Sequence, residues 1–518
     1  MVVVGAGAAG LMAAIHAAGG ERPVVLLERT RDGGRKILIS GGGRCNVLPS
    51  RLSPSQFVTA SSPHALKKLL LSWPLAEQRL FFEERLGLRL VLEEETGKLF
   101  PESNRARDVR DGLVRLAHGS GVETRFAVKV RGVRPQLATG GERGGGRWLV
   151  LVEDGEPLPA HAVILATGGL SVPATGSDGI GLRIARQLGH TVHETYPALT
   201  PLTAEPSAHA HLAGVSLDVT LTAPLPRGRF TTRGGFLFTH RGYSGPAVLD
   251  VSHLAVRSRP RGDAERQEVR VQWTEHDAPA WERLLAAGAS GEVGPLVRRF
   301  LPQRLADALL READVPGATR LAHLRREDRA RLVQTLARYA LPWTGDEGYR
   351  KAEVTGGGVA LGEVDPRTLE SRLHPGLFLC GEILDAFGPI GGYNFAWAWA
   401  TGRAAGLGAC VDPAAPRSTQ GARPAEPGVG GGRGGEGAQR CAESSRRSAN
   451  TSARMQETKP TASRRPKRLI PPSTQTHRRS PSACSMSCQT AVVSMAPPQW
   501  AGGRWGRKPS MTHSSVSG

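Results

Sequence analysis

The first 28 residues combine two apolar runs with a glycine-rich turn between them. Val2-Val3-Val4 predicts a buried strand, and a second strand is predicted from Val24 to Leu27, ending at Glu28. Small and apolar residues from about Gly10 to Ala18 predict the intervening helix. This order indicates a βαβ unit with parallel strands. The opening run also resembles the apolar core of a signal peptide, but no basic residue precedes it and the first charge is Glu21.

The glycine spacing of this turn predicts a dinucleotide site. Gly5 allows a sharp turn off the strand, Gly7 lets the backbone approach a pyrophosphate, and Gly10 permits close packing of helix on strand. The helix N-terminus near Ala8 favours negative charge. Glu28, 18 residues beyond Gly10, can accept hydrogen bonds from both hydroxyls of an adenosine ribose, which argues against a 2′-phosphate there. The alternative is a glycine-rich turn that binds nothing.

Apolar runs farther along the chain predict that the same sheet is completed there. Val163 to Leu165 and Leu377 to Cys380 are typical of buried strands that end in small-residue turns. A helix is predicted from about Tyr393 to Gly402. The βαβ unit at the start and the strand and helix after Leu377 are both predicted to bind one nucleotide, so they must belong to a single sheet. Residues from about 190 to 350 are therefore predicted to be an insertion.

The predicted insertion has a pattern of its own. Alternating polar and apolar residues from Val215 to Leu221 indicate antiparallel strands. From Trp281 to Tyr339, the spacing of leucines and arginines predicts amphipathic helices joined by proline and glycine turns. The insertion should therefore contain a β-rich part followed by a helical part.

The chain has 518 residues and a formal net charge of +20 that is unevenly distributed. Residues 413–518 hold 17 Lys and Arg against 4 Glu, which leaves +7 for residues 1–412. This last stretch has six Val, Leu and Ile and no Phe or Tyr, too few to offset the entropic cost of ordering a backbone. We expect a disordered basic tail at 412–518, either a low-complexity linker or an out-of-frame extension of the gene. Because the charge lies there, with Trp500 and Trp505 alone to stack on bases, we expect no nucleic-acid partner.

The six cysteines change the picture little. None forms a C-x-x-C pair, so we expect neither a zinc site nor a disulfide framework, and a reducing, cytoplasmic compartment fits. Cys45 lies in a basic loop that would lower its thiol pKa, yet no second cysteine stands near it to form a redox dithiol. No run of about 18 apolar residues occurs, so no membrane-spanning helix is expected.

A second glycine-rich segment introduces a family resemblance. Gly41-Gly42-Gly43 is framed by Arg35, Lys36 and Arg44, so backbone N–H groups and cations can face an anionic ligand. The string from Gly34 to Asn46 resembles the signature of a bacterial family of FAD-dependent oxidoreductases that includes aminoacetone-oxidase-like proteins and a 3-dehydro-bile-acid reductase. Further strings similar to this family are Val163 to Gly169, Thr175 to Gly179, Tyr196 to Leu202, Leu237 to Pro246, Val354 to Val359, Gly376 to Asp385 and Gly391 to Asn394. Together they cover most of residues 1–408.

The resemblance implies an α/β fold with FAD as the cofactor. A Rossmann-like FAD-binding domain would carry an inserted β-barrel-like domain and a helical subdomain that cap the flavin. The predicted boundaries are 1–189 for the first part of the FAD-binding domain, 190–350 for the insertion, 351–411 for the C-terminal part of the FAD-binding domain and 412–518 for the tail.

We expect FAD to contact the glycine turns, the basic loop and the C-terminal motif. In the resemblance, Asp385 binds the ribityl or pyrophosphate part of FAD, whereas the residues alone allow an ordinary turn or cap carboxylate. The turn from Gly391 to Asn394 would place a helix N-terminus at the pyrimidine side of the isoalloxazine, where its dipole stabilises negative charge on reduced flavin. The predicted cofactor-binding residues are Gly5, Gly7, Ala8, Gly10, Glu28, Arg29, Arg35, Lys36, Gly43, Arg44, Asn46, Thr167, Gly168, Gly381, Glu382, Asp385, Gly391, Gly392, Tyr393 and Asn394.

No catalytic residue is assigned from the sequence. His240 lies beside glycine-rich turns and could donate a proton, but a lone histidine is more often structural. No second strand, glycine turn and helix with a closing acid occurs. Either NAD(P)H therefore binds transiently at the flavin, or the substrate reduces the flavin and oxygen reoxidises it.

These observations predict a cytoplasmic FAD-dependent oxidoreductase that transfers hydride between the flavin N5 and a small organic substrate. The residues leave the direction of transfer open. Two alternatives remain, an FAD-dependent RNA-modifying protein, since the tail is basic, and a flavin-binding protein without turnover.

Overall fold

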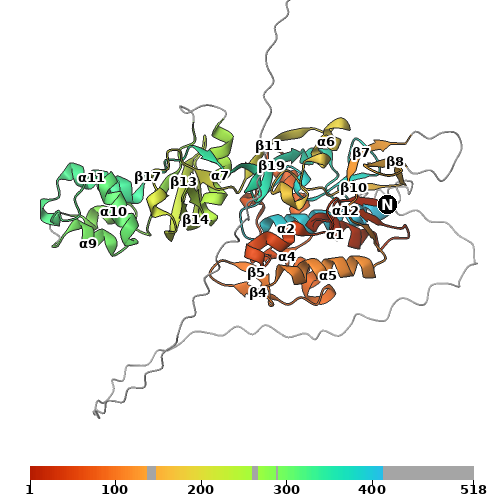
Figure 1. Cartoon of the computed structure of the whole chain (residues 1–518), viewed down its shortest axis with the longest axis horizontal. Helices are drawn as coiled ribbons and strands as arrows, with labels where there is room; N and C mark the ends of the chain where they lie inside the picture. The colour runs from red at the N-terminus through yellow and green to blue at the C-terminus, as the bar shows by residue number, and fades with distance from the viewer. Residues whose placement is uncertain (137–146, 260–265, 287–289, 412–518) are drawn as a thin grey trace, which may run out of the picture. The chain divides into compact units, whose positions relative to one another are not determined.

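The computed structural model describes residues 1–136, 147–259, 266–286 and 290–411 (Figure 1). Its central element is a five-stranded parallel sheet with the order β20-β10-β1-β2-β6. The strands are β1 (Val2–Val4), β2 (Val25–Leu27), β6 (Glu123–Arg125), β10 (Val163–Leu165) and β20 (Leu377–Leu379). The predicted Rossmann-like α/β fold is confirmed. The predicted basic tail, 412–518, lies outside the described residues.

Helix α12 (Tyr393–Cys410) follows β20 and packs along α1 (Ala8–Ala17), the helix after β1. It is longer than predicted, because Gly402 does not end it. Gly402 lies inside the helix, where a Cβ would collide with the carbonyl oxygen of Ala9. The glycine therefore allows the two helices to approach backbone to backbone.

The buried tryptophans of α12 hold the helix in place through their ring N–H groups. Trp397 Nε1 donates to the carbonyl oxygen of Gly381 at 3.1 Å, and Trp399 Nε1 donates to that of Val47 at 3.1 Å. Both rings are fully buried. The helix is therefore tied to the turn after β20 and to the start of β3.

Smaller elements surround the parallel sheet. One three-stranded sheet contains β3 (Leu48–Pro49), β4 (Leu90–Glu93) and β5 (Lys98–Pro101), and another contains β7 (Val130–Pro135), β8 (Trp148–Val152) and β9 (Leu158–Ala160). The helices are α2 (Arg35–Ile39), α3 (Pro63–Leu70), α4 (Leu75–Leu80), α5 (Ala106–Gly119) and α6 (Ile180–Gln187).

A second group of elements lies between β11 (Val192–Ala198) and β19 (Val354–Val359), which pair with each other in antiparallel orientation. An antiparallel seven-stranded sheet has the order β17-β16-β13-β14-β15-β12-β18. Its strands are β12 (Leu202–Thr203), β13 (Ser216–Pro224), β14 (Arg229–Thr239), β15 (Gly242–Ser244), β16 (Arg270–Gln272), β17 (Tyr339–Ala340) and β18 (Gly345–Asp346). The helices are α7 (Pro246–Ser258), α8 (Ala278–Leu284), α9 (Val293–Arg298), α10 (Gln303–Glu312) and α11 (Arg326–Ala337).

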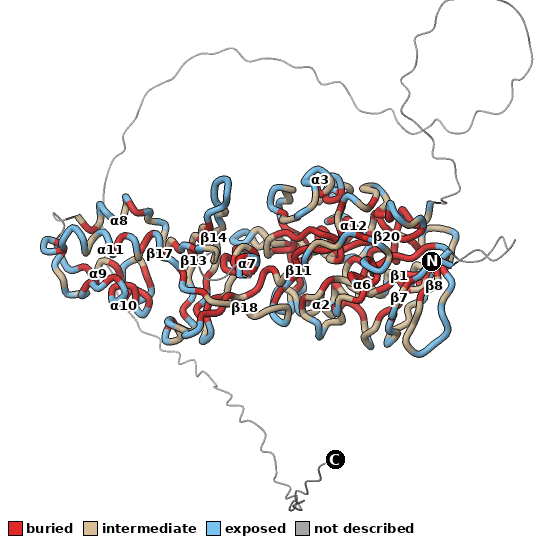
Figure 2. The backbone as a smooth tube through the Cα atoms, turned by 90° about the horizontal axis from the view of Figure 1, so that it is seen from above, coloured by how far each residue is buried: buried red, intermediate tan, exposed pale blue. Residues whose placement is uncertain are grey.

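The two groups have separate hydrophobic cores (Figure 2). One core contains β1, β10, β20, α1 and α12, and the other contains apolar residues between Leu202 and Trp343. The strands predicted around Val215 to Leu221 and the helices predicted between Trp281 and Tyr339 are both present. The separate core supports our proposal that residues 190–350 form an inserted domain.

Adding a methyl group at Gly402 is predicted to separate α12 from α1. We expect Gly402→Ala to lower the free energy of unfolding by about 1–3 kcal/mol, because overpacking forces backbone shifts. Gly119→Ala is the matched control, since Gly119 is also helical and has no atom within 4 Å of the position of an added Cβ. Urea unfolding of both variants measures the difference, and equal stability would contradict the contact.

Candidate functional site

A cavity of about 900 Å³ lies where β1, β2 and β10 end. Val4, Leu27 and Ala166, at these strand ends, form part of its wall. The carboxyl edge of a parallel sheet is where open α/β folds bind ligands. The predicted cofactor residues that line the cavity are Gly5, Gly7, Ala8, Glu28, Arg29, Arg35, Lys36, Arg44, Asn46, Thr167, Gly168, Glu382, Gly391, Gly392 and Asn394.

The predicted residues that do not line the cavity are Gly10, Gly43, Gly381, Asp385 and Tyr393. Gly10 packs α1 on the turn after β1, which is the structural role its spacing predicted. A Cβ on Gly381 would lie 2.7 Å from the Cβ of Ala9, so this glycine also serves packing. The Tyr393 hydroxyl accepts a hydrogen bond from Gln56 Nε2 at 2.9 Å, away from the cavity. These positions shape the wall without forming it.

At one end of the cavity, the Glu28 carboxylate follows β2. Its Oε2 accepts from the Ala6 N–H at 2.8 Å, and its Oε1 accepts from the Thr30 N–H at 2.8 Å and from Thr30 Oγ1 at 2.7 Å. These bonds orient the carboxylate and leave acceptor capacity on Oε2. Gly7, at the N-terminus of α1, has open space where a Cβ would point. A phosphate can therefore approach the backbone N–H groups there.

The chemistry of the wall changes along the cavity in a way that fits FAD. The lining includes Glu28 and Thr167, and also Gly392 and Trp397. Carboxylate and backbone groups suit the ribose and pyrophosphate at one end, and apolar and aromatic side chains suit an isoalloxazine at the other. The residues present therefore fit the whole dinucleotide.

A partly buried ion pair forms part of the wall. Lys36 Nζ donates to Glu382 Oε2 at 2.6 Å and to Ser171 Oγ at 2.6 Å. Glu382 Oε1 accepts from Ser171 Oγ at 2.5 Å and from the Thr355 N–H at 3.0 Å. Burial opposes ionisation of Glu382, but Lys36 and the neighbouring donors outweigh it, so the pKa of Glu382 is lowered. The Glu382 carboxylate is therefore held ionised by groups from three other segments.

The far end of the cavity is apolar. Leu199, Phe387 and Ile390 line it, within a small hydrophobic cluster. The Ile390 N–H donates to Asp250 Oδ1 of α7 at 2.8 Å. Burial raises the pKa of Asp250 to about 6, against the effect of this hydrogen bond. Asp250 therefore ties the second group of elements to the loop that borders the cavity.

Arginines of the predicted basic loop are bound to nearby acids. Arg35 Nε donates to Asp32 Oδ1 at 2.6 Å, and Arg44 Nη1 donates to Glu93 Oε1 at 3.0 Å. The Arg44 guanidinium also lies 4.0 Å from the ring centroid of Phe100. Both arginines line the cavity, so they remain candidates for cofactor contact.

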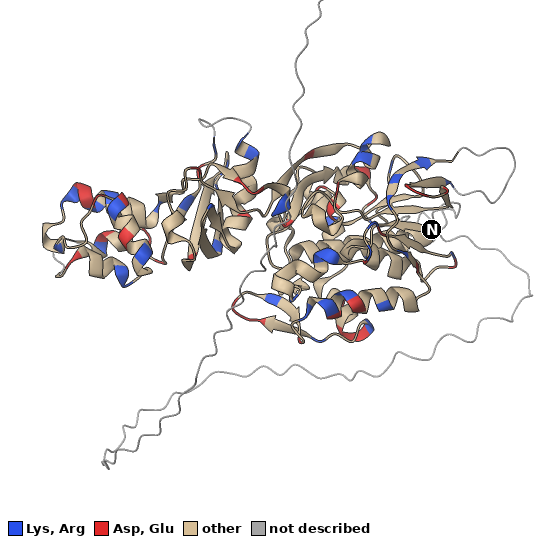
Figure 3. Cartoon of the chain, in the orientation of Figure 1, with Lys and Arg blue, Asp and Glu red and all other residues tan. Residues whose placement is uncertain are grey.

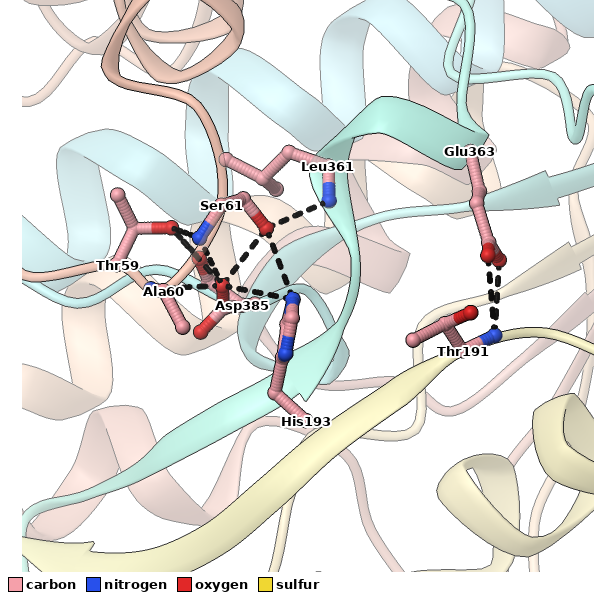
Figure 4. A network of polar contacts seen from close by, with 8 residues as sticks. All are labelled: Thr59, Ala60, Ser61, Thr191, His193, Leu361, Glu363 and Asp385. Carbon is pink, nitrogen blue, oxygen red and sulfur yellow. Dashed lines mark hydrogen bonds and ion pairs between the residues drawn. The ribbon is translucent and has the colours of Figure 1, made fainter.

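Asp385 lies in a buried polar network instead of on the cavity wall (Figure 4). Its Oδ2 accepts hydrogen bonds from Thr59 Oγ1 at 2.9 Å, from the Ala60 N–H at 2.9 Å, and from the N–H and Oγ of Ser61 at 2.8 and 2.7 Å. His193 Nε2 lies 3.7 Å from the same oxygen. This geometry favours a structural carboxylate, because protein donors already occupy Oδ2 of Asp385, while the flavin-ligand role stays a prediction that no contact in the structure tests.

The expectation for the Cys45 thiol is corrected, and His240 stays without a catalytic role. Burial raises the pKa of the Cys45 thiol to about 12, the reverse of the predicted lowering. His240 is exposed and does not line the cavity. Among the residues described, Cys45, Cys380 and Cys410 are free thiols, and no cluster of His, Cys, Asp and Glu suits a metal ion. No helix within the described ranges is long and apolar enough to cross a membrane.

Several lining residues were missed by sequence reasoning. Lys98 and Phe100 reach the cavity from β5, a strand that the sequence did not predict. Glu353 also lines it and directly precedes the Val354 to Val359 string of the family resemblance, which was the available signal. For Lys98 the sequence gives no signal, since folding alone brings β5 to the site.

Comparisons with known proteins agree with this geometry. The family model described as HI0933-like protein Rossmann domain matches residues 1–408. A protein of Escherichia coli K12 named ribosomal RNA dihydrouridine synthase is 33% identical over 411 residues, covering 77% of this chain and 95% of that protein. A protein of Clostridium scindens named 3-dehydro-bile acid delta(4,6)-reductase is 32% identical over 419 residues, covering 79% of this chain and 99% of that protein.

Solved structures with a similar arrangement have low sequence identity. An open conformation of a flavocytochrome c3 fumarate reductase has a TM-score of 0.41 at 16% identity, covering 79% of this chain and 77% of that chain. A 3-ketosteroid-delta4-(5alpha)-dehydrogenase from Rhodococcus jostii RHA1 has a TM-score of 0.42 at 16% identity, covering 79% of this chain and 96% of that chain.

Replacing Asp385 tests its structural role. We expect Asp385→Ala to lower the free energy of unfolding of the apoprotein by about 1.5–3 kcal/mol, because it removes hydrogen bonds to a charged group and leaves buried N–H groups without an acceptor. FAD affinity should stay close to that of wild type. Urea unfolding and FAD titration measure the two quantities, with exposed Asp154→Ala as the control. A tenfold or greater loss of FAD affinity with unchanged stability would support the flavin assignment.

Removing the cation of the partly buried ion pair should cost stability in a pH-dependent way. We expect Lys36→Met to lower the free energy of unfolding at pH 7 by about 1–3 kcal/mol, because the partly buried Glu382 carboxylate is left without its cationic partner. Without Lys36 the pKa of Glu382 should rise, so the variant recovers part of this loss as pH falls and Glu382 becomes protonated. Unfolding at pH 5 and pH 7 measures this, with exposed Lys67→Met as the control. A pH-independent difference would contradict it.

Proposed function

The chain belongs to the HI0933-like Rossmann family, an FAD-binding family of oxidoreductases, and we propose that it reduces a carbon–carbon double bond conjugated to a carbonyl group. The predicted FAD-dependent oxidoreductase is thereby confirmed, and the alternative of a flavin-binding protein without turnover is set aside. When bound, FAD supplies the hydride.

The proposal rests on the bond chemistry that two relatives share. Dihydrouridine differs from uridine by hydrogen added across the 5,6 double bond, which is conjugated to a ring carbonyl. The delta(4) double bond of a 3-dehydro bile acid is likewise conjugated to the ketone at C3. Both reductions place a hydride on the β carbon and a proton on the α carbon. Relatives named for such different molecules, each at least 32% identical to this chain, point to the reaction more firmly than to the substrate.

The residues of this chain bind and orient the reactants. The turn at Gly5 and Gly7 presents backbone N–H groups to the pyrophosphate, and Glu28 accepts from the ribose. The N-terminus of α12, at Gly392, faces the same cavity and favours negative charge beside it. Leu199 and Phe387 exclude water from the apolar end, where a substrate ring would stack.

We propose NAD(P)H as the reductant, bound transiently at the flavin. The sequence contains no second glycine-rich dinucleotide motif of the kind that opens the chain. A nicotinamide would therefore enter and leave by the apolar end before the substrate does.

A uridine within RNA is the second candidate substrate. The E. coli relative and a Haemophilus influenzae relative, 30% identical over 422 residues, both have the name ribosomal RNA dihydrouridine synthase. An RNA would need its target base extruded and its phosphates bound by cations. Lys and Arg are interspersed with Asp and Glu over α5 and α8 to α11 (Figure 3), where Arg325 and Arg331 both pair with Asp328. We therefore propose a small cyclic enone as the first candidate substrate and a uridine within RNA as the second.

Half-reactions of the full-length holoprotein test the proposed function. We expect the released flavin to be FAD, and NADH or NADPH to bleach it without oxygen. Adding 2-cyclohexenone or a Δ4-3-ketosteroid should then restore the oxidised flavin spectrum, whereas cyclohexanone, which lacks the double bond, should not. A ribosomal RNA transcript, assayed for dihydrouridine by mass spectrometry, tests the second candidate. If oxygen reoxidises the flavin but neither the enones nor the RNA do, the proposal is overturned in favour of an oxidase.

A further inference from the structure

Glu353 lies where the chain returns from the second group of elements to the parallel-sheet domain. Its backbone N–H donates to the carbonyl oxygen of Leu199 at 3.1 Å, and the next residue, Val354, pairs with Ala198 of β11. Leu199 and Glu353 both line the cavity. Two paired strands therefore fix the backbone that presents the Glu353 side chain at the apolar end.

Glu353 differs from the other acids of the cavity wall in having no partner. Glu28 and Glu382 both accept hydrogen bonds from protein groups. Glu153 pairs with two cations, Lys129 and Arg131, and Asp178 pairs with Arg29. Of the cavity carboxylates in the described part of the chain, the Glu353 side chain alone has neither a hydrogen bond nor an ion pair. A carboxyl group left in this state is available to a ligand.

The surroundings raise the pKa of Glu353. The residue is exposed and lines the cavity, yet the protein atoms packed around its carboxyl disfavour the charged form and raise its pKa. Lys36, from α2, opposes this rise, and Glu382, from the turn after β20, adds to it. Since Lys36 is already bound to Glu382, its charge is largely compensated.

Other titratable groups near the apolar end suit proton donation less well. Burial raises the pKa of Tyr196 to about 12 and lowers that of His253 to about 4. His253 is therefore neutral at pH 7 and has no proton to give as an imidazolium. Asp250, which accepts from the Ile390 N–H, does not line the cavity. Neither do Tyr196 and His253, whereas Glu353 does.

We propose that Glu353 is the general acid of the reaction, an assignment that rests on the double-bond reduction proposed above. The β carbon of the substrate gains a hydride, with its electron pair, from the reduced cofactor. The π electrons move toward the carbonyl oxygen, and the α carbon takes the proton of the Glu353 carboxyl. The flavin is thereby oxidised by two electrons and is reduced again by NAD(P)H. The Glu353 carboxylate regains its proton from water.

The two half-reactions separate this role from a structural one. We expect Glu353→Gln holoprotein to be reduced by NADPH at the wild-type rate, because hydride transfer to the flavin does not use the acid. Its reoxidation by 2-cyclohexenone should be about a hundredfold slower or more, the usual effect of losing a general acid. The matched control is Glu194→Gln, an exposed glutamate of the neighbouring strand β11 that does not line the cavity.

The pH dependence of reoxidation provides a second measurement. The wild-type rate should fall as pH rises through the pKa of Glu353, because the carboxylate has no proton to donate. The glutamine variant should lose this dependence and keep its low rate at every pH. A variant that reoxidises at the wild-type rate, or keeps the same pH dependence, overturns the assignment of Glu353.

A spectral titration tests the placement of Glu353 without turnover. A charge that forms beside the isoalloxazine shifts its absorption, so the oxidised wild-type holoprotein should show a pH-dependent step that Glu353→Gln lacks. The same step in both proteins would place Glu353 away from the flavin and overturn the assignment. If reduced wild-type protein reduces neither the enone nor the RNA, the proposed function is wrong, and the role of Glu353 as its general acid is wrong with it.

Discussion

Backbone contact between α1 and α12 sets the geometry on which the cofactor site depends. A side chain at Gly402 or Gly406 would collide with carbonyl oxygens of α1, and one at Gly10 would collide with the turn after β1. Because these three positions have no side chain, the helices lie close enough for both N-termini to border one cavity. The pyrophosphate turn and the turn at Gly392 are therefore placed by packing, before any ligand contributes.

The junction between the two groups of elements supplies polar contacts next to the apolar end of the cavity. The chain leaves the parallel-sheet domain through Ala198 and returns through Val354, and these two residues pair with each other. Asp250, within the second group, holds the Ile390 N–H of the cavity loop. The paired strands therefore fix the cavity wall at the point where the chain passes between the two groups.

Local spacing was enough to predict the βαβ opening and the strands at 163–165 and 377–380, because turns and strand ends are determined by sequence neighbours. Roles that depend on distant partners could not be read in this way. Glu382 and Asp385 lie in one motif, yet Lys36 holds the first on the cavity wall while donors from residues 59–61 surround the second. Glu353 was missed for the same reason, since what distinguishes it is the lack of a partner after folding.

The central position of β1 has a consequence for how the protein is made. This strand precedes the other described elements in the chain, but in the finished sheet it lies between β2 and β10, and the helix α12 that packs along α1 begins at Tyr393. The face of α1 that packs against α12 must therefore wait until almost all of the described chain has been translated, although β2 and α5 contact α1 earlier. The segment from Leu202 to Trp343 has its own core and is complete earlier. Translation therefore allows the segment from Leu202 to Trp343 to fold before the parallel-sheet domain is complete.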